Sequence, residues 1–208
     1  MYIYKTPLWV KKLFPHYLWH KTREEKTLYL TFDDGPVPGV TEWVLTTLQA
    51  FQAKATFFCV GENLRKYPHL FERLLQEGHR IGNHTYHHLK GWGTADQAYE
   101  QDIAHCQALI EERAVVQEAL FRPPYGRITP KQGKQLLTQY KIVMWDVLAH
   151  DYDARINPVV ALRKIIQHST NGTIIVFHDS YKAEHNLRAI LPAYLQHFSD
   201  LGFRFAPL

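Results

Sequence analysis

Cysteine, long apolar runs and clusters of like charge are all scarce in this 208-residue sequence. The two cysteines, Cys59 and Cys106, allow at most one disulfide, which excludes a disulfide-rich scaffold. They fall in different predicted elements, so we expect two buried, reduced thiols that are not bonded to each other. No stretch approaches the ~20 consecutive apolar residues that a membrane-spanning helix needs.

Basic and acidic residues are dispersed along the chain. Lysine and arginine exceed aspartate and glutamate by 24 − 20 = 4, and the isoelectric point is near 9.0. Proteins that bind nucleic acid usually concentrate such charge on one face or tail, and no such run is present. The sequence therefore predicts no nucleic-acid partner.

Apolar residues, in contrast, are plentiful. The chain is 46% hydrophobic and only 21% charged, which argues against intrinsic disorder and allows a sizeable core in one domain. No repeat, low-complexity segment or Gly/Ser linker interrupts it, and we expect a monomer. Histidine is the unusual count: there are thirteen, each a potential metal ligand or proton carrier.

Residues 1–25 form a predicted N-terminal extension to a domain over residues 26–208. The longest apolar run in the extension, Leu8-Trp9-Val10, is shorter than the roughly 7–15 apolar residues of a signal-peptide core. We therefore expect no cleavable signal and a cytoplasmic location. The aromatic residues and lysines of residues 1–20 fit two interpretations: a helix packed on the domain, or a segment in weak contact with a membrane surface.

From Lys26 onward, predicted strands alternate with predicted helices, which favours parallel strands joined by crossover helices. A doubly wound sheet and a barrel both fit, but a complete eightfold barrel takes ~250 residues. Polar clusters follow most of the strands, and in a barrel these strand ends converge on one mouth. We therefore predict an α/β fold, a distorted and incomplete (β/α) barrel of about seven parallel strands. The expected strands are Thr27–Phe32, Ala55–Val60, His79–Asn83, Leu120–Arg122, Lys141–Asp146, Thr173–His178 and Phe203–Phe205.

Two adjacent carboxylates end the first predicted strand. Asp33 and Asp34 precede Gly35-Pro36, and one interpretation is a turn that caps the next helix. Adjacent residues at a strand end also point in different directions. One carboxylate can then bind a metal while its neighbour accepts a proton.

Two histidines four residues apart follow the third predicted strand. His84 and His88 would share one face of a helical turn, where one metal at ~2.0–2.1 Å from each imidazole could bind. Such a pair also arises by chance in a histidine-rich chain. It lacks the glutamate of the zinc-protease motif, so that chemistry is not indicated.

A proline-rich loop and two polar strand ends complete the set. The loop Arg122–Gly126 could present a backbone N–H to a developing oxyanion, or form a structural cis-proline turn. Asp151 follows the fifth predicted strand, and His178 ends the sixth as either a packed residue or a proton donor. Two histidines and one carboxylate leave a metal position open for water, which is typical of catalytic sites. The pattern predicts metal-assisted hydrolysis of an acyl bond.

In this order, the segments TFDDGP, HTYHH and RPPYG and the strand-ending His178 resemble the motifs of the polysaccharide deacetylases, the NodB-like domain of carbohydrate esterase family four. The resemblance covers roughly residues 26–208. It implies a distorted (β/α) barrel, in agreement with the strand count. It also implies removal of N-acetyl groups from an N-acetylglucosamine-containing glycan of the peptidoglycan or chitin type.

The resemblance implies a metal site and a base. Asp34, His84 and His88 are the implied metal ligands. Asp33 is the implied general base for the attacking water, and Arg122 the group that positions it. The implied cofactor is a divalent metal ion, with zinc first and cobalt, nickel, manganese or iron as alternatives.

The remaining roles concern the oxyanion and the departing amine. The backbone N–H of Tyr125 is the implied oxyanion donor. His178 is the implied general acid, and Asp151 the carboxylate that tunes it. Where the family usually has tryptophan and leucine, this chain has Tyr152 and Val176. With Pro123 and Tyr125, these two are expected to contact the substrate around the acetyl pocket.

Two other functions remain open at this point. One is a related C–N hydrolase acting on a small cyclic amide. The other is a non-catalytic carbohydrate-binding domain that has kept the metal, although Asp33 and His178 are both present. A peptidoglycan substrate would favour the cell envelope over the cytoplasm.

Overall fold

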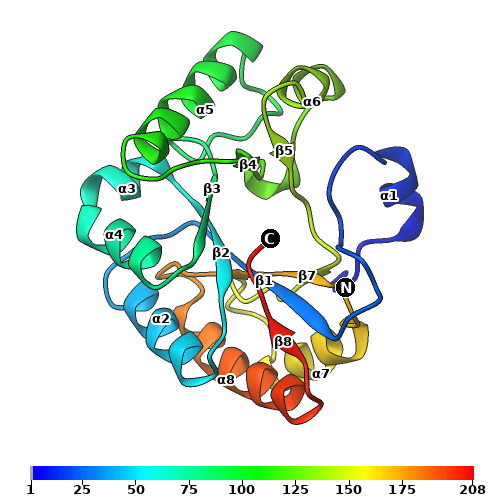
Figure 1. The fold of residues 1–208 in the computed structure, drawn as a ribbon. Coiled ribbons are helices and arrows are strands. Elements are labelled where there is room, and N and C mark those ends of the chain that lie inside the picture. The colour runs from blue at the N-terminus through cyan, green and yellow to red at the C-terminus, as the bar shows by residue number, and fades with distance from the viewer. Residues whose placement is uncertain (1) are drawn as a thin grey trace.

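A curled parallel sheet forms the centre of the molecule in the computed structural model, which describes residues 2–208 (Figure 1). The strand order is β5-β4-β3-β2-β1-β7-β6, and β8 pairs with β1. Every pairing between these strands is parallel. The predicted incomplete barrel is therefore confirmed. The strands are β1 Thr27–Asp33, β2 Ala55–Cys59, β3 Arg80–Asn83, β4 Leu120–Phe121, β5 Lys141–Ile142, β6 Val147–Leu148, β7 Ile174–His178 and β8 Arg204–Phe205.

Helices form an outer ring around the strands (Figure 1). Proline begins several of them; in α7, for example, Pro158 follows Asn157, whose side chain accepts hydrogen bonds from the N–H groups of Val159 and Val160. The helix α3 was not expected from the sequence. The helices are α1 Leu8–Leu13, α2 Val40–Ala50, α3 Gly61–Lys66, α4 Pro68–Gln76, α5 Asp96–Glu111, α6 Pro130–Leu136, α7 Pro158–His168 and α8 Glu184–Asp200.

The core lies on both faces of the central strands. Leu28, Leu30 and Phe32 of β1 are fully buried, as are their neighbours in β2 and β7. Phe32 stacks on Phe57 and Phe177, with ring centroids 5.0 and 5.8 Å away. Burial on both faces explains why these strands are continuous apolar runs rather than alternating ones. Cys59 and Cys106 are buried and free, as expected.

The sheet is open between β5 and β6, and the N-terminal segment lies along both of these edges. Leu18 N–H donates to the Ile142 carbonyl, and the Leu18 carbonyl accepts from Met144 N–H, both at 2.8 Å. At the other edge, Leu148 N–H donates to the Tyr4 carbonyl at 3.0 Å. The strand edges are thereby paired rather than exposed.

Two sequence predictions for these segments are wrong in detail. The strand expected over Lys141–Asp146 covers only Lys141–Ile142, and β6 begins after the expected range, at Val147. The chain leaves β4 and begins to pair with β7 where Asp146 N–H donates to the Ile174 carbonyl. The helix expected within residues 1–20 covers only Leu8–Leu13, since the flanking residues are committed to the sheet edges. Among residues 2–208, no helix is long and apolar enough to span a membrane.

The buried carboxylate of Asp146 binds two cationic side chains of the N-terminal segment. Asp146 is fully buried and pairs with the ammonium of Lys11 and with Arg23 Nη2 at 2.8 Å. Burial raises the pKa of Asp146, but the hydrogen bonds from Lys11 and Arg23 outweigh that effect and hold it below the usual range.

Replacing Asp146 by asparagine is expected to lower the free energy of unfolding by about 2 kcal/mol at pH 7, because two cations lose a buried carboxylate. Urea denaturation measures this. A carboxyl with a lowered pKa stabilises the fold above its unfolded pKa, so the difference from wild type should shrink below about pH 4. Glu118→Gln is the control, since Glu118 is 53% exposed and its ion pairs are solvated.

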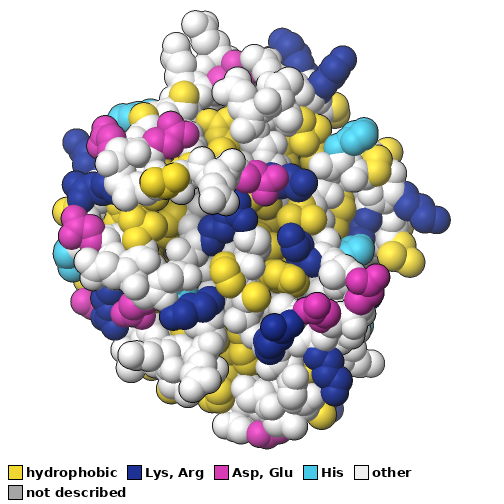
Figure 2. Space-filling model, viewed as in Figure 1, with side chains coloured by type: hydrophobic (Ala, Val, Ile, Leu, Met, Phe, Trp, Pro, Cys, Tyr) yellow, Lys and Arg dark blue, Asp and Glu magenta, His cyan; other side chains and the backbone are white. Residues whose placement is uncertain are grey.

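Charge on the surface is mixed. Figure 2 shows lysine and arginine side chains interspersed with acidic ones on the face that it presents. That distribution agrees with the dispersed charge in the sequence.

Candidate active site

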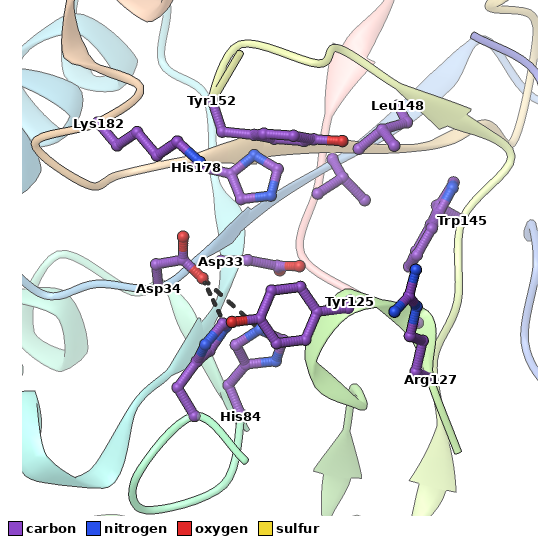
Figure 3. A pocket seen from close by; sticks show the side chains of 13 residues that line it. Asp33, Asp34, His84, Tyr125, Arg127, Trp145, Leu148, Tyr152, His178 and Lys182 are labelled. Carbon is purple, nitrogen blue, oxygen red and sulfur yellow. Dashed lines mark ion pairs between the residues drawn. The ribbon is translucent and has the colours of Figure 1, made fainter. Parts of the chain in front are cut away.

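A cavity of about 390 Å³ opens at the carboxyl ends of the strands (Figure 3). Strand β1 ends in it with Asp33, and β7 ends in it with His178. Parallel strands bring these chemically distinct ends to one mouth. The lining residues are Asp33, Asp34, His84, His88, Tyr125, Gly126, Arg127, Trp145, Leu148, Tyr152, Val176, His178 and Lys182.

Asp34, His84 and His88 form a cluster whose ligand atoms all lie within 4.8 Å of one another. Asp34 Oδ1 is 3.1 Å from His88 Nε2 and 3.7 Å from His84 Nε2. Asp34 and His88 both have left-handed backbone conformations, with φ of 80° and 56°. This strain is retained where the two side chains are turned toward one another, as is common at functional sites.

The protonation of the cluster suits a metal. His84 Nδ1 is 2.7 Å from the Arg122 carbonyl, which accepts only from a protonated nitrogen, so Nε2 keeps its lone pair for a metal. Burial lowers the pKa of His84 to about 4, although Asp33 acts in the opposite direction. Burial raises the pKa of Asp34, but its hydrogen bond with His88 and the nearby histidines hold it well below the usual range. The donor set therefore fits a divalent metal, which needs deprotonated ligands.

Asp102 accepts hydrogen bonds from the loop that carries His84 and His88. Its Oδ2 accepts from Tyr86 N–H at 2.8 Å and from His87 N–H at 3.0 Å, and Oδ1 is 2.5 Å from His87 Nδ1. His87 thus turns away from the cluster. Asp102 was not predicted as a site residue; the available signal was an acidic residue on the apolar face of a predicted helix, four residues before Cys106.

Asp33 faces a fully buried guanidinium. Arg122 Nη1 donates to Asp33 Oδ1 and to Thr31 Oγ1, both at 2.7 Å. Its other nitrogens donate to the carbonyls of Val143 and Met144 at 3.2 and 2.9 Å. Burial lowers the pKa of Arg122, but Asp33 counteracts this, and the group stays cationic. Arg122 therefore fixes the Asp33 carboxylate in one orientation.

His178 is paired with Asp151. Its Nδ1 is 2.8 Å from Asp151 Oδ1, and its backbone N–H donates to Oδ2 at 2.9 Å. Burial lowers the pKa of His178, but the Asp151 carboxylate outweighs this and raises it to about 9. The imidazole is therefore protonated at neutral pH. Because Nδ1 is paired with Asp151, Nε2 is the nitrogen that can donate to a ligand in the cavity.

The loop after β4 presents Tyr125 at the cavity rim. Tyr125 has a φ of 60°, and its ring lies 4.8 Å from that of His88. A Cβ at Gly126 would lie 2.6 Å from the Trp145 indole, so only glycine fits there. Among residues 2–208, the one cis peptide precedes Pro36, so the interpretation of this loop as a cis-proline turn is wrong.

A second buried acid supports the loop after β1. Asp179 Oδ1 accepts from Gly35 N–H at 3.2 Å, and Oδ2 accepts from the Thr41 hydroxyl at 2.6 Å. Burial raises the pKa of Asp179 to about 8. No role for Asp179 was predicted from the sequence. Its contacts show that it holds the turn next to Asp34.

Not all of the residues expected to contact the substrate line the cavity. Tyr152 and Val176 line the cavity, and the Tyr152 ring lies 4.8 Å from His178 at 75°. Pro123 is buried behind the loop and is not among the lining residues, so its contact with substrate stays a prediction. Arg127 and Lys182 also line the cavity, and no motif had pointed to them.

Tyr152→Trp and Val176→Leu are expected to change substrate preference or turnover while metal occupancy stays near that of the wild type. Neither side chain belongs to the Asp34 cluster, and both lie on the cavity wall. Metal content and rates on several acyl substrates, measured on the same preparations, provide the check. Strong metal loss in either variant would show that the pocket has been misplaced.

Comparison with known proteins assigns the family. A family model described as polysaccharide deacetylase matches residues 20–145. A peptidoglycan-N-acetylglucosamine deacetylase of Bacillus cereus is 34% identical over 90% of this chain and 88% of its own length. The peptidoglycan-N-acetylglucosamine deacetylase PgdA of Listeria monocytogenes is 30% identical over 90% of this chain, which spans 39% of that protein.

A solved structure agrees. The crystal structure of the Bc1960 peptidoglycan N-acetylglucosamine deacetylase, in complex with 4-naphthalen-1-yl-N-oxidanyl-benzamide, superposes with a TM-score of 0.88 at 30% identity. The match covers 98% of this chain and 95% of that one. The chain is therefore an enzyme of the polysaccharide deacetylase family.

Proposed function

We propose that this protein removes N-acetyl groups from an N-acetylglucosamine-containing glycan, releasing acetate and a free amine. One observation carries the proposal: the Asp34, His84 and His88 cluster lies in the same cavity as an arginine-held carboxylate, Asp33, and a protonated histidine, His178. This set supplies a metal site, a base and an acid around one reacting acetamide.

A divalent ion held by Asp34, His84 and His88 would supply Lewis acidity, which lowers the pKa of water and polarises a carbonyl. Asp33 accepts the proton of the attacking water, and Arg122 keeps this carboxylate oriented. The backbone N–H of Tyr125 donates to the oxygen of the acetyl carbonyl as negative charge develops.

The amine departs with a proton from the opposite side of the cavity. His178 donates that proton from Nε2, while Asp151 holds Nδ1 and stabilises the protonated ring. Zinc is the proposed metal because histidine and carboxylate ligands suit it, and cobalt, nickel, manganese or iron would use the same ligands.

The relatives favour peptidoglycan as substrate, with chitin-type oligosaccharides as the second choice. A peptidoglycan substrate would place the reaction in the cell envelope rather than in the cytoplasm. We propose that the enzyme acts as a monomer, because a single chain supplies all of the proposed catalytic groups.

The test is deacetylation by metal-free protein before and after addition of one metal at a time. Peptidoglycan, N-acetylglucosamine oligomers and small cyclic amides form the panel, and both acetate and free amine are measured. Acetate release from a glycan that depends on metal supports the proposal. Hydrolysis of the cyclic amides alone would favour the other C–N hydrolase, and metal and glycan binding without hydrolysis would favour the non-catalytic domain.

A further inference from the structure

The N-terminal segment reaches the wall of the cavity through a buried histidine, His150. His150 is 8% exposed and packs against the rings of Tyr2 and Tyr4, each with its centroid 5.1 Å away. Its Nε2 is 3.0 Å from the Ile3 carbonyl, and its Nδ1 is 3.2 Å from the Tyr152 hydroxyl. The ring therefore joins residue 3 of the chain to a residue that lines the active site.

The acceptor at residue 3 fixes the direction of both hydrogen bonds. The Ile3 carbonyl has no hydrogen to give, so His150 Nε2 must donate to it. In a neutral imidazole the other nitrogen is then an acceptor, and the Tyr152 hydroxyl donates its hydrogen to Nδ1. Burial lowers the pKa of His150, which favours this neutral form.

This direction determines what Tyr152 offers to a ligand. Its single hydroxyl hydrogen is donated to His150, so the phenolic oxygen can offer a ligand its lone pairs but no further hydrogen. Figure 3 shows the Tyr152 ring beside His178, and the centroids of the two rings lie 4.8 Å apart. Tyr152, His178 and Leu148 all line the cavity.

We propose that Ile3 and His150 hold the Tyr152 oxygen as a hydrogen-bond acceptor for a hydroxyl or amide N–H of the bound glycan. His150 is then a positioning residue, and Tyr152 contributes to specificity for substrates that carry such a donor beside the reacting acetamide. The inference deepens the proposed function and depends on it for the identity of the ligand. It also gives the Ile3 carbonyl a part in substrate binding.

Two substitutions isolate the two ends of this contact. Tyr152→Phe removes only the oxygen. His150→Asn removes the bridge but suits the backbone, because residue 150 has a φ of 57° and asparagine tolerates that region. With the metal-loaded protein and an N-acetylglucosamine oligomer, each variant should raise KM about three- to tenfold with little change in kcat.

The double variant tests the connection. If His150 acts through Tyr152, then His150→Asn combined with Tyr152→Phe should raise KM no more than either change alone. Tyr2→Phe is the matched control, since it removes a hydroxyl from the same aromatic cluster, one that donates to Asp153 at 3.0 Å, and it should leave KM unchanged.

Several outcomes would overturn the inference. Additive effects would show that His150 and Tyr152 act separately, and an unchanged KM in Tyr152→Phe would remove the acceptor role. A fall in kcat of His150→Asn with a shifted alkaline limb of the pH profile would mean that His150 acts through the neighbouring Asp151 and His178 instead.

A nitrogen NMR spectrum of the histidines separates this inference from the proposed function. The His150 signals, assigned as those lost in His150→Asn, should show a protonated Nε2 and an unprotonated Nδ1 whose shift changes in Tyr152→Phe. A protonated Nδ1 would overturn the inference even if the enzyme deacetylates glycans. If the wild type deacetylates no glycan, the proposed function fails, while this spectrum still decides the hydrogen-bond direction.

Discussion

Asp33→Asn is expected to keep its metal and to lose deacetylation about 10²–10⁴-fold, the usual effect of a missing general base. This corresponds to roughly 3–5 kcal/mol of barrier at 1.36 kcal/mol per tenfold change. Asp33 lies outside the ligand cluster and is hydrogen-bonded to Arg122. Asparagine still offers Oδ1 to the buried guanidinium, so the fold should be retained.

Asp34→Ala is the matched comparison and should lose metal and activity together, because it removes one of three donors. Metal stoichiometry and deacetylation rate are measured on the same preparations of both variants. If Asp33→Asn emptied the site while Asp34→Ala left it filled, the proposed roles would be reversed. Full activity in both would contradict the deacetylase mechanism itself.

The second large effect concerns the proton donor. His178→Ala is expected to keep its metal and to lower kcat by a factor of about 10²–10⁴, because the amine then departs without a positioned acid. In the wild type, the raised pKa of about 9 keeps His178 protonated at neutral pH. The acid is lost as pH rises through that value, so kcat should fall on the alkaline side.

Asp151→Asn tests the origin of this pKa. The carboxylate is the main group that raises it, so its removal should move the alkaline limb of the kcat profile to lower pH. Asp153→Asn is the control: Asp153 lies two residues away and pairs with the exposed Arg155. An alkaline limb that stays in place in Asp151→Asn would argue that another group is the acid.

Local sequence patterns predicted the central strands well. The strands expected near β1, β2 and β7 agree with the structure to within a residue at each end, because long buried runs are strong local signals. The strand β6 and the edge pairing of residues 4–18 were not predicted. This strand and this pairing depend on residues that are far apart in the sequence, such as Leu18 and Val143, and that meet only in the folded chain. The division of the chain at residue 25 stays a prediction.

The residues of the candidate site were also predicted only in part. Asp33, Asp34 and His178 could be located because strand ends in a barrel share one mouth. Asp102, Asp179 and the bridge through His150 were missed, since their partners are backbone groups or side chains set by the path of distant loops. The residues that meet in the cavity were therefore predictable from the sequence, whereas the residues that hold them in place were not.

The pairing of the N-terminal segment with β5 and β6 also constrains the order of folding. Residues 4–18 are synthesised well before their partners Ile142, Val143 and Leu148, which lie far along the sequence. Contacts of such high sequence separation form slowly, because a long loop must close before they stabilise anything. On the ribosome this segment must therefore wait, with its backbone donors unpaired, until the opposite side of the barrel has emerged.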